Sequence, residues 1–203
     1  MHGLTKKELK ILGKLDTPAK IQNFLDKIGI NFEPHGATYM SPHMVLKTRK
    51  AHCFEGALLA ATALRLQGQK PLIVDLVATR EDRDHVIAVF KENGCWGAIS
   101  KTNHAVLRYR EPVYKTIREL VMSYFHEYFL HSGKKTLRAY SLPIDLSRFD
   151  NTGWITSEKN LWHIRRYLDT VPHYKILTPA TIRTLRKADP IEIKAGKIVS
   201  EKE

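Results

Sequence analysis

The sequence predicts an α+β fold in which an apolar helix packs on an antiparallel sheet. Residues 53–68 carry alanines and leucines at helical spacing and end at Gly68, which indicates a helix that begins close to Cys53. Two short apolar runs follow, and the Asn93-Gly94 pair after the second is typical of a β-hairpin. The links between these runs are too short for parallel crossovers, so we expect antiparallel strands.

Two helices are expected before this one. Leucine and isoleucine recur at helical intervals in residues 4–15, and a second helix starts at Thr17-Pro18 and ends at Gly29. Residues 30–50 are interrupted by proline and glycine and show no sustained periodicity. We therefore predict an irregular segment there that leads into the cysteine-bearing helix.

The strands of the sheet follow that helix in order. Residues 72–77 and 85–90 form apolar runs of strand length, and residues 95–99 complete the hairpin. Residues 105–109 are a candidate fourth strand.

The second half of the chain is predicted to be mostly helical. A buried helix is expected from Thr116, where Thr and Glu have capping-box spacing, and further helices are expected after Ser157 and Thr178. Residues 131–153 are predicted as loop. Asp189-Pro190 is expected to close the last helix, and the residues after it are expected to form a frayed tail.

These elements suggest one domain. Residues 1–145 would form the core together with the N-terminal helices, and residues 146–203 would form a helical C-terminal extension that packs on this core.

The net charge of +12 raises the question of nucleic-acid binding. Residues 1–52 hold nine Lys or Arg against four Asp or Glu, residues 53–110 hold eight against six, and residues 111–203 hold sixteen against eleven. The positive excess is diffuse and forms no basic block, so it favours weak contact with polyanions without a recognition mechanism. We expect no specific nucleic-acid partner.

The remaining composition indicates a cytoplasmic protein. No apolar run approaches the roughly 20 residues needed to cross a bilayer, and the first residues lack the apolar segment of a signal peptide. Two cysteines, Cys53 and Cys95, are too few for a disulfide framework. We expect no membrane association, and nothing in the sequence indicates an oligomeric state.

Cys53 is the first candidate for chemistry. At the start of a helix, unpaired backbone N–H groups and the positive end of the helix dipole favour thiolate over thiol. The alternative is a small buried hydrophobe that begins a core helix. His85 is the candidate base, because it begins a strand whose end can meet the start of the helix at one edge of the sheet.

The order of these residues resembles the transglutaminase-like superfamily, whose core is the papain-type cysteine-hydrolase fold. The matching residues are Cys53, Ala57, Leu64, Arg65 and Gly68 in the helix, His85 at the second strand and Trp96 after the hairpin turn. The resemblance covers residues 45–105. It implies Cys53 as nucleophile and His85 as general base, with a thioester intermediate that water or an amine resolves.

Two positions depart from the family pattern. Ala51 stands where the family commonly has glycine, and Ser100 stands where the third member of the site is usually aspartate. Serine could hydrogen-bond the imidazole without adding charge. Asn103 is the other candidate third member, since asparagine orients the histidine in papain-type enzymes.

A zinc site would be a competing use of these side chains. Cys53, Cys95, His52, His85 and His104 could supply ligands, but none of the usual closely spaced pairs is present. We therefore expect neither metal nor cofactor.

The sequence thus predicts a cofactor-free thiol hydrolase or acyltransferase that acts on an amide bond of a peptide or protein. Two alternatives stay open: a catalytically silent binding module of the same fold, and a basic nucleic-acid-binding protein.

Overall fold

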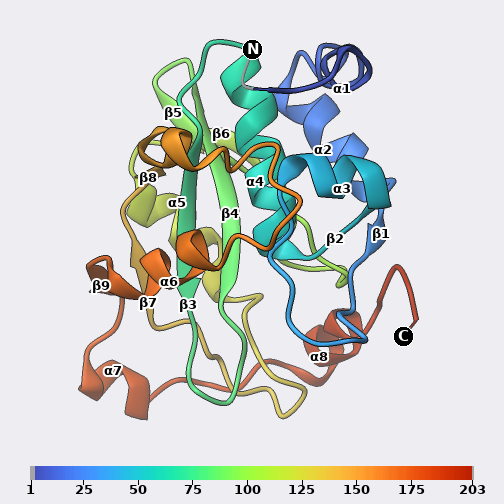
Figure 1. Ribbon diagram of the computed structural model, residues 1–203. Coiled ribbons are helices and arrows are strands. Elements are labelled where there is room, and N and C mark those ends of the chain that lie inside the picture. Colours follow the sequence, from blue (N-terminus) through green and yellow to red (C-terminus); the bar gives the residue numbers. More distant parts are fainter. Residues whose placement is uncertain (1–2, 203) are drawn as a thin grey trace.

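The structure, a computed structural model, describes residues 3–202 and places helices on both faces of a sheet (Figure 1). The helices are α1 (Lys6–Leu12), α2 (Pro18–Asp26), α3 (Pro42–Thr48), α4 (Cys53–Leu66), α5 (Ile117–Phe125), the 3-10 helix η1 (Leu146–Thr152), α6 (Trp162–Thr170), α7 (Pro179–Arg183) and α8 (Pro190–Gly196). The strands are β1 (Gly29–Ile30), β2 (Lys50–Ala51), β3 (Leu72–Val77), β4 (His85–Glu92), β5 (Cys95–Ile99), β6 (Arg110–Tyr114), β7 (Ala139–Ser141), β8 (Ile144–Asp145) and β9 (His173–Lys175).

The main sheet has the order β6-β5-β4-β3-β7-β9, with β8 paired to β3 beside β7. Every pairing in it is antiparallel, whereas β1 and β2 form a separate parallel pair. In Figure 1 the two central strands, β3 and β4, run through the middle of the molecule. The predicted α+β class with an antiparallel sheet is therefore confirmed.

The sheet separates two hydrophobic cores because successive strand residues point to opposite faces. One core contains α4, whose alanines and leucines from Ala57 to Leu64 are fully buried, together with Phe90 of β4 and Ile164 of α6. The other core contains α5 and the opposite face of the same strands, with Val89 among its members. The sheet is thus covered on both faces.

The central helix and the hairpin lie where the sequence predicts them. α4 begins at Cys53, and its apolar face is broad because it is buried from several sides. β3 spans the predicted residues 72–77, and β5 spans the predicted residues 95–99. Asn93 and Gly94 both have positive φ, as a tight hairpin turn requires.

The prediction of an irregular segment over residues 30–50 was wrong in part. Helix α3 occupies residues 42–48, with Ser41 as its N-cap and Pro42 in its first turn. Proline is compatible with that position because the first-turn N–H needs no helical partner. The proline that suggested a break is therefore a helix start.

The fourth strand lies later than predicted. Residues 105–109 are not a strand, because Leu107 has a φ of 60° and the Ala105 N–H donates to the Ile198 carbonyl. On the side of β5 away from β4, the pairing strand is instead β6, residues 110–114.

Two further segments predicted as irregular are ordered. Residues 131–153 contain β7 and β8, which are short and flank Pro143, and both pair with β3. Asp189-Pro190 does not close a helix but begins α8, with a capping box between Asp189 and Glu192.

The C-terminal residues are not frayed either, since they dock on the body of the protein. The Glu201 N–H donates to Asn103 Oδ1 at 2.9 Å, and the Glu201 carboxylate accepts from the Ile30 N–H at 3.0 Å. Figure 1 shows this segment passing from α8 toward β1.

Residues 146–202 contribute both to the main sheet and to the core around α4. Their strand β9 pairs with β7 at the edge of the sheet, and Ile164 and Leu168 of α6 are buried in the same core as α4. Within residues 3–202, no helix is both long and apolar enough to cross a membrane.

Gly97 in β5 marks a point of very tight packing in the hairpin. A Cβ atom placed there would lie 2.4 Å from Phe90 Cζ and 2.8 Å from the Arg110 carbonyl oxygen. We predict that Gly97→Ala destabilises the protein by roughly 1–3 kcal/mol, because the backbone oxygen cannot move aside without disturbing β6. Urea unfolding measures this change.

Gly68→Ala is the matched control. Gly68 has a φ of 85°, and a methyl group added there would meet no atom within 4 Å. Alanine at this position therefore costs only the backbone strain, about 1 kcal/mol. Equal losses of stability in the two variants would contradict the packing argument.

Candidate active site

Cys53 is the first residue of α4 and is partly exposed, whereas Cys95 is buried. Cys95 pairs with Glu92 at the turn end of the hairpin, and His85 lies at the other end of β4. Both cysteines are free. The thiol at the helix start is therefore the one with access to solvent and to the predicted base.

His85 is held by a chain of hydrogen bonds that defines its tautomer. Its Nε2 lies 2.7 Å from Ser100 Oγ, and this hydroxyl donates its single proton to the Leu107 carbonyl at 2.7 Å. The serine oxygen can then only accept from the ring, so Nε2 carries a proton and Nδ1 is the nitrogen left for Cys53.

Ser100 is itself fixed on its backbone side. Its N–H donates to Gln22 Oε1 at 2.9 Å, and Gln22 Nε2 donates to the Ser100 carbonyl at 2.8 Å. Ser100 is 1% exposed, so these bonds form away from water. The Gln22 side chain of α2 thereby locks the serine in the position that faces His85.

Asn103, the other candidate third member, does not face His85. Its side chain donates to the Glu201 carbonyl and accepts from the Ser200 hydroxyl and the Glu201 N–H. The structure thus brings Cys53, His85 and Ser100 together and uses Asn103 to hold the C-terminal segment.

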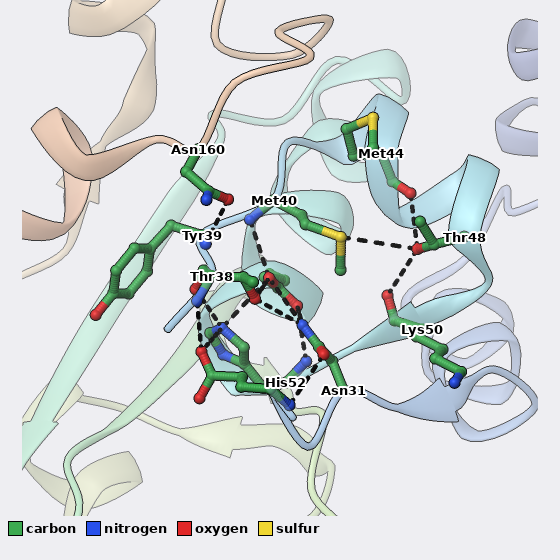
Figure 2. A network of polar contacts seen from close by, with 11 residues as sticks. Asn31, Thr38, Tyr39, Met40, Met44, Thr48, Lys50, His52 and Asn160 are labelled. Atoms are coloured by element: carbon green, nitrogen blue, oxygen red, sulfur yellow. Dashed lines mark hydrogen bonds and ion pairs between the residues drawn. The ribbon is translucent and has the colours of Figure 1, made fainter. Parts of the chain in front are cut away.

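A buried carboxylate lies in the first turn of the helix that Cys53 begins. Glu55, in the first turn of α4, is fully buried and accepts hydrogen bonds from Asn31 Nδ2, Thr38 Oγ1, the Met40 N–H and the His52 N–H, at distances from 2.8 to 3.2 Å. Figure 2 shows these partners converging on one network. The carboxylate therefore fastens residues 31–40 to the start of the helix.

His52, the N-cap residue, places a second imidazole beside Cys53. Its Nε2 lies 2.9 Å from the Thr38 carbonyl, 3.4 Å from Glu55 Oε1 and 3.6 Å from Glu33 Oε1. Because the carbonyl only accepts, this nitrogen is protonated and Nδ1 is left for the sulfur. The thiol thus contacts the rings of both His52 and His85.

The two rings change the acidity of the thiol. Burial alone would raise the pKa of Cys53, but hydrogen bonds from His52 and His85 and their positive charge lower it well below its usual range. For His52, burial opposes ionisation, yet the contacts with Cys53, Glu55 and the Thr38 carbonyl raise its pKa to about 9. Both shifts favour a thiolate beside an imidazolium.

Aromatic side chains and a groove flank this site. Tyr39 meets Phe54 edge-on at 5.4 Å between centroids and Trp162 at 4.5 Å, and Trp162 is 42% exposed. An open groove of about 650 Å³ begins at the segment that binds the His52 ring. It is lined by Thr38, Met40, Met44, Glu158, Lys159, Asn160 and Trp162.

Two of the five residues considered as zinc ligands lie away from Cys53, His52 and His85. Cys95 lies at the far end of the hairpin, and His104 forms a bridge with Val199. Among the described residues, no group of three or more His, Cys, Asp or Glu side chains is placed to hold a metal ion.

The structure adds two residues to the candidate site: Glu55, which the sequence analysis did not name, and His52, which it considered only as a zinc ligand. A signal was available, because a glutamate three positions after the N-cap is the capping-box spacing, which predicts a carboxylate turned back on the helix start. The partners Asn31 and Thr38 carried no such signal, since they come from a segment without periodicity.

The sequence matches no protein-family model, and no curated protein matches it.

Ser100→Ala should release the His85 ring. The variant removes the acceptor that fixes the proton on Nε2, so we expect the ring to populate both tautomers, and the Leu107 carbonyl to lose its partner at a cost of about 1–3 kcal/mol. Nitrogen-15 chemical shifts of the His85 ring report the tautomer. Asn103→Ala is the control, and a shift of the His85 signals in that variant instead would contradict the assignment.

Asp75 is a buried carboxylate on β3, the strand beside the one that carries His85. Its Oδ2 lies 3.1 Å from His173 Nε2, and its backbone N–H donates to Ser141 Oγ. Burial, together with the charge of Asp84, raises the pKa of Asp75 to about 6, although His173 and Arg165 oppose the shift. A carboxyl group with a raised pKa favours the folded state when it is protonated.

The stability that Asp75 contributes should therefore be present below about pH 4 and disappear as the pH rises through about 6. Relative to Asp75→Asn, the wild type should lose on the order of 1–3 kcal/mol between about pH 4 and pH 7. Urea unfolding of both proteins across this range measures the difference. Parallel pH dependences would show that the carboxyl group is not perturbed.

Proposed function

We propose that the protein is a thiol-dependent hydrolase or acyltransferase that acts on an amide bond of a peptide or protein, with a transglutaminase-like core of the papain type. The observation that supports this proposal most strongly is the position of Cys53 at the start of α4, in contact with a histidine whose tautomer is fixed by Ser100. The chemistry needs no metal or cofactor.

The reaction begins with attack of the Cys53 sulfur on the carbonyl carbon of the substrate. A sulfur–carbon bond forms, and the proton of the thiol resides on Nδ1 of His85. His85 then gives this proton to the leaving amine as the carbon–nitrogen bond breaks, which leaves a thioester on Cys53. The N-terminal end of α4 favours the negative charge that develops on the carbonyl oxygen.

The second half of the reaction restores the enzyme. Water or an amine gives a proton to His85 as it attacks the thioester carbon, and the sulfur–carbon bond breaks. The acyl group leaves as an acid or a new amide, and His85 returns its proton to the leaving sulfur or to solvent.

The groove beside His52 provides room for part of the substrate. Its methionine and tryptophan side chains offer apolar contact, and Lys159 and Glu158 lie at its wall. We propose a peptide or protein as substrate on this basis, and a reducing cytoplasmic setting on the basis of two free cysteines.

A catalytically silent binding module of the same fold is the second candidate. The observation that favours it is Ser100, because a hydroxyl adds no negative charge beside the imidazolium that forms during catalysis. The two candidates differ in whether Cys53 can be acylated and then released.

Activated acyl esters test the proposal without knowledge of the natural substrate. We expect p-nitrophenyl esters of N-acetylated amino acids to release nitrophenolate in a burst and to leave one acyl group on Cys53, detected by intact mass and peptide mapping. His85→Gln should slow the release of this acyl group about 10²- to 10⁴-fold, because the group that accepts the proton of the attacking water or amine is lost.

Cys95→Ala is the control and should behave as the wild type, since Cys95 is buried at the far end of the hairpin. Equal and slow labelling of Cys53 and Cys95 would contradict an activated thiol. An acyl group that forms on Cys53 but is never released to water or to an added amine would favour the silent module.

A further inference from the structure

The two histidines that contact Cys53 have different surroundings. The Nε2 side of His52 faces three acceptors, namely the Thr38 carbonyl, Glu55 and Glu33, of which two are carboxylates. The Nε2 side of His85 faces one neutral hydroxyl, Ser100, which passes its own proton to a carbonyl. Among the described residues, no carboxylate forms an ion pair with His85.

Burial strengthens the difference between the rings. The Glu55 side chain is fully buried, Glu33 is 24% exposed, and the His52 side chain is 18% exposed. Charges in such a poorly solvated position interact more strongly than charges at the surface. The carboxylates therefore favour a proton on each nitrogen of His52, whereas the hydroxyl beside His85 provides no comparable charge.

From this geometry we propose that His52 is a second functional histidine, which remains protonated and holds Cys53 as a thiolate, while His85 transfers the proton during acyl transfer. The division of roles rests on the proposed function. The ion pair between His52 and Cys53 does not, because it requires no substrate.

This arrangement accounts for the missing aspartate at position 100. In a site with one histidine, the third member supplies the negative charge that stabilises the imidazolium. Here Glu55 supplies that charge to the other ring, through a carboxylate that also holds the His52 N–H. A neutral Ser100 then suits His85, which must both accept and release a proton.

Several titratable groups surround the pair and enter its pH dependence. Glu33 comes from the segment after β1, Glu55 from α4 itself and His85 from β4. Tyr39 places its ring edge-on to His52, and the pKa of Tyr128 is raised by burial and by nearby charges that include Cys53.

The test is the pH profile of Cys53 alkylation by iodoacetamide in a Cys95→Ala background. In the parent protein we expect a thiolate-like rate that persists well below neutral pH. His52→Gln should move the profile upward by about one unit or more, which corresponds to at least a roughly tenfold loss of rate at about pH 5.5. Circular dichroism checks that each variant is folded.

Two further variants keep the proposal testable if His52→Gln does not fold. Glu33→Gln retains the hydrogen bond that the Thr38 N–H donates to this side chain but removes one carboxylate, so it should move the profile in the same direction by a smaller amount. His85→Gln should shift the alkylation profile less than His52→Gln does, while it slows acyl transfer. An unchanged profile in His52→Gln, or a larger shift in His85→Gln, would overturn the proposal.

The outcomes for the two proposals are separable. A shifted alkylation profile in His52→Gln, without any acyl transfer by the parent protein, would contradict the proposed function and support the ion pair between His52 and Cys53. Acyl transfer by the parent protein, with an alkylation profile that His52→Gln does not change, would support the proposed function and contradict the functional role of His52.

Discussion

The buried carboxylate of Glu55 is the interaction on which the site depends. An unpaired carboxylate in this position would be very costly, and the structure avoids that cost with four neighbouring donors and the positive end of the helix. Because two of these donors come from Thr38 and Met40, the same bonds that satisfy the charge also fix the segment that contacts the His52 ring. The Glu55 carboxylate thus links the start of α4, the segment that contains Thr38 and Met40, and the His52 ring beside the thiol.

The site combines this charged half with a neutral one. On the His85 side, Ser100 and Gln22 form a buried chain of uncharged hydrogen bonds that ends on backbone groups of residues 100 and 107. Such a chain orients a ring without fixing its charge, whereas carboxylates fix both. The thiol lies between two imidazoles that are held by different kinds of partner, and in the proposed mechanism one ring holds a charge while the other moves a proton.

The sequence predicted the parts of the fold with strong local patterns. α4 and the β4–β5 hairpin follow from periodicity and from Asn93-Gly94, and Cys53 and His85 are brought together because these elements are adjacent. It missed α3 and α8 because Pro42 and Pro190 suggested breaks although both lie in first turns. It could not choose between Ser100 and Asn103, because that choice depends on Leu107 and Glu201, whose contacts are set by tertiary structure.

The order of the sheet has a consequence for how the protein folds during synthesis. Cys53, His85 and Ser100 lie on α4, β4 and the end of β5, which are consecutive in the chain apart from β3, and β3 pairs directly with β4. Contacts between such neighbours close shorter loops than contacts with the later strands, so we expect them to form first. Residues 22–55 are made before β4 and β5. Once these two strands have followed, the start of α4, the Glu55 carboxylate and both histidines can come together, while the later strands β7 and β9 have yet to emerge from the ribosome.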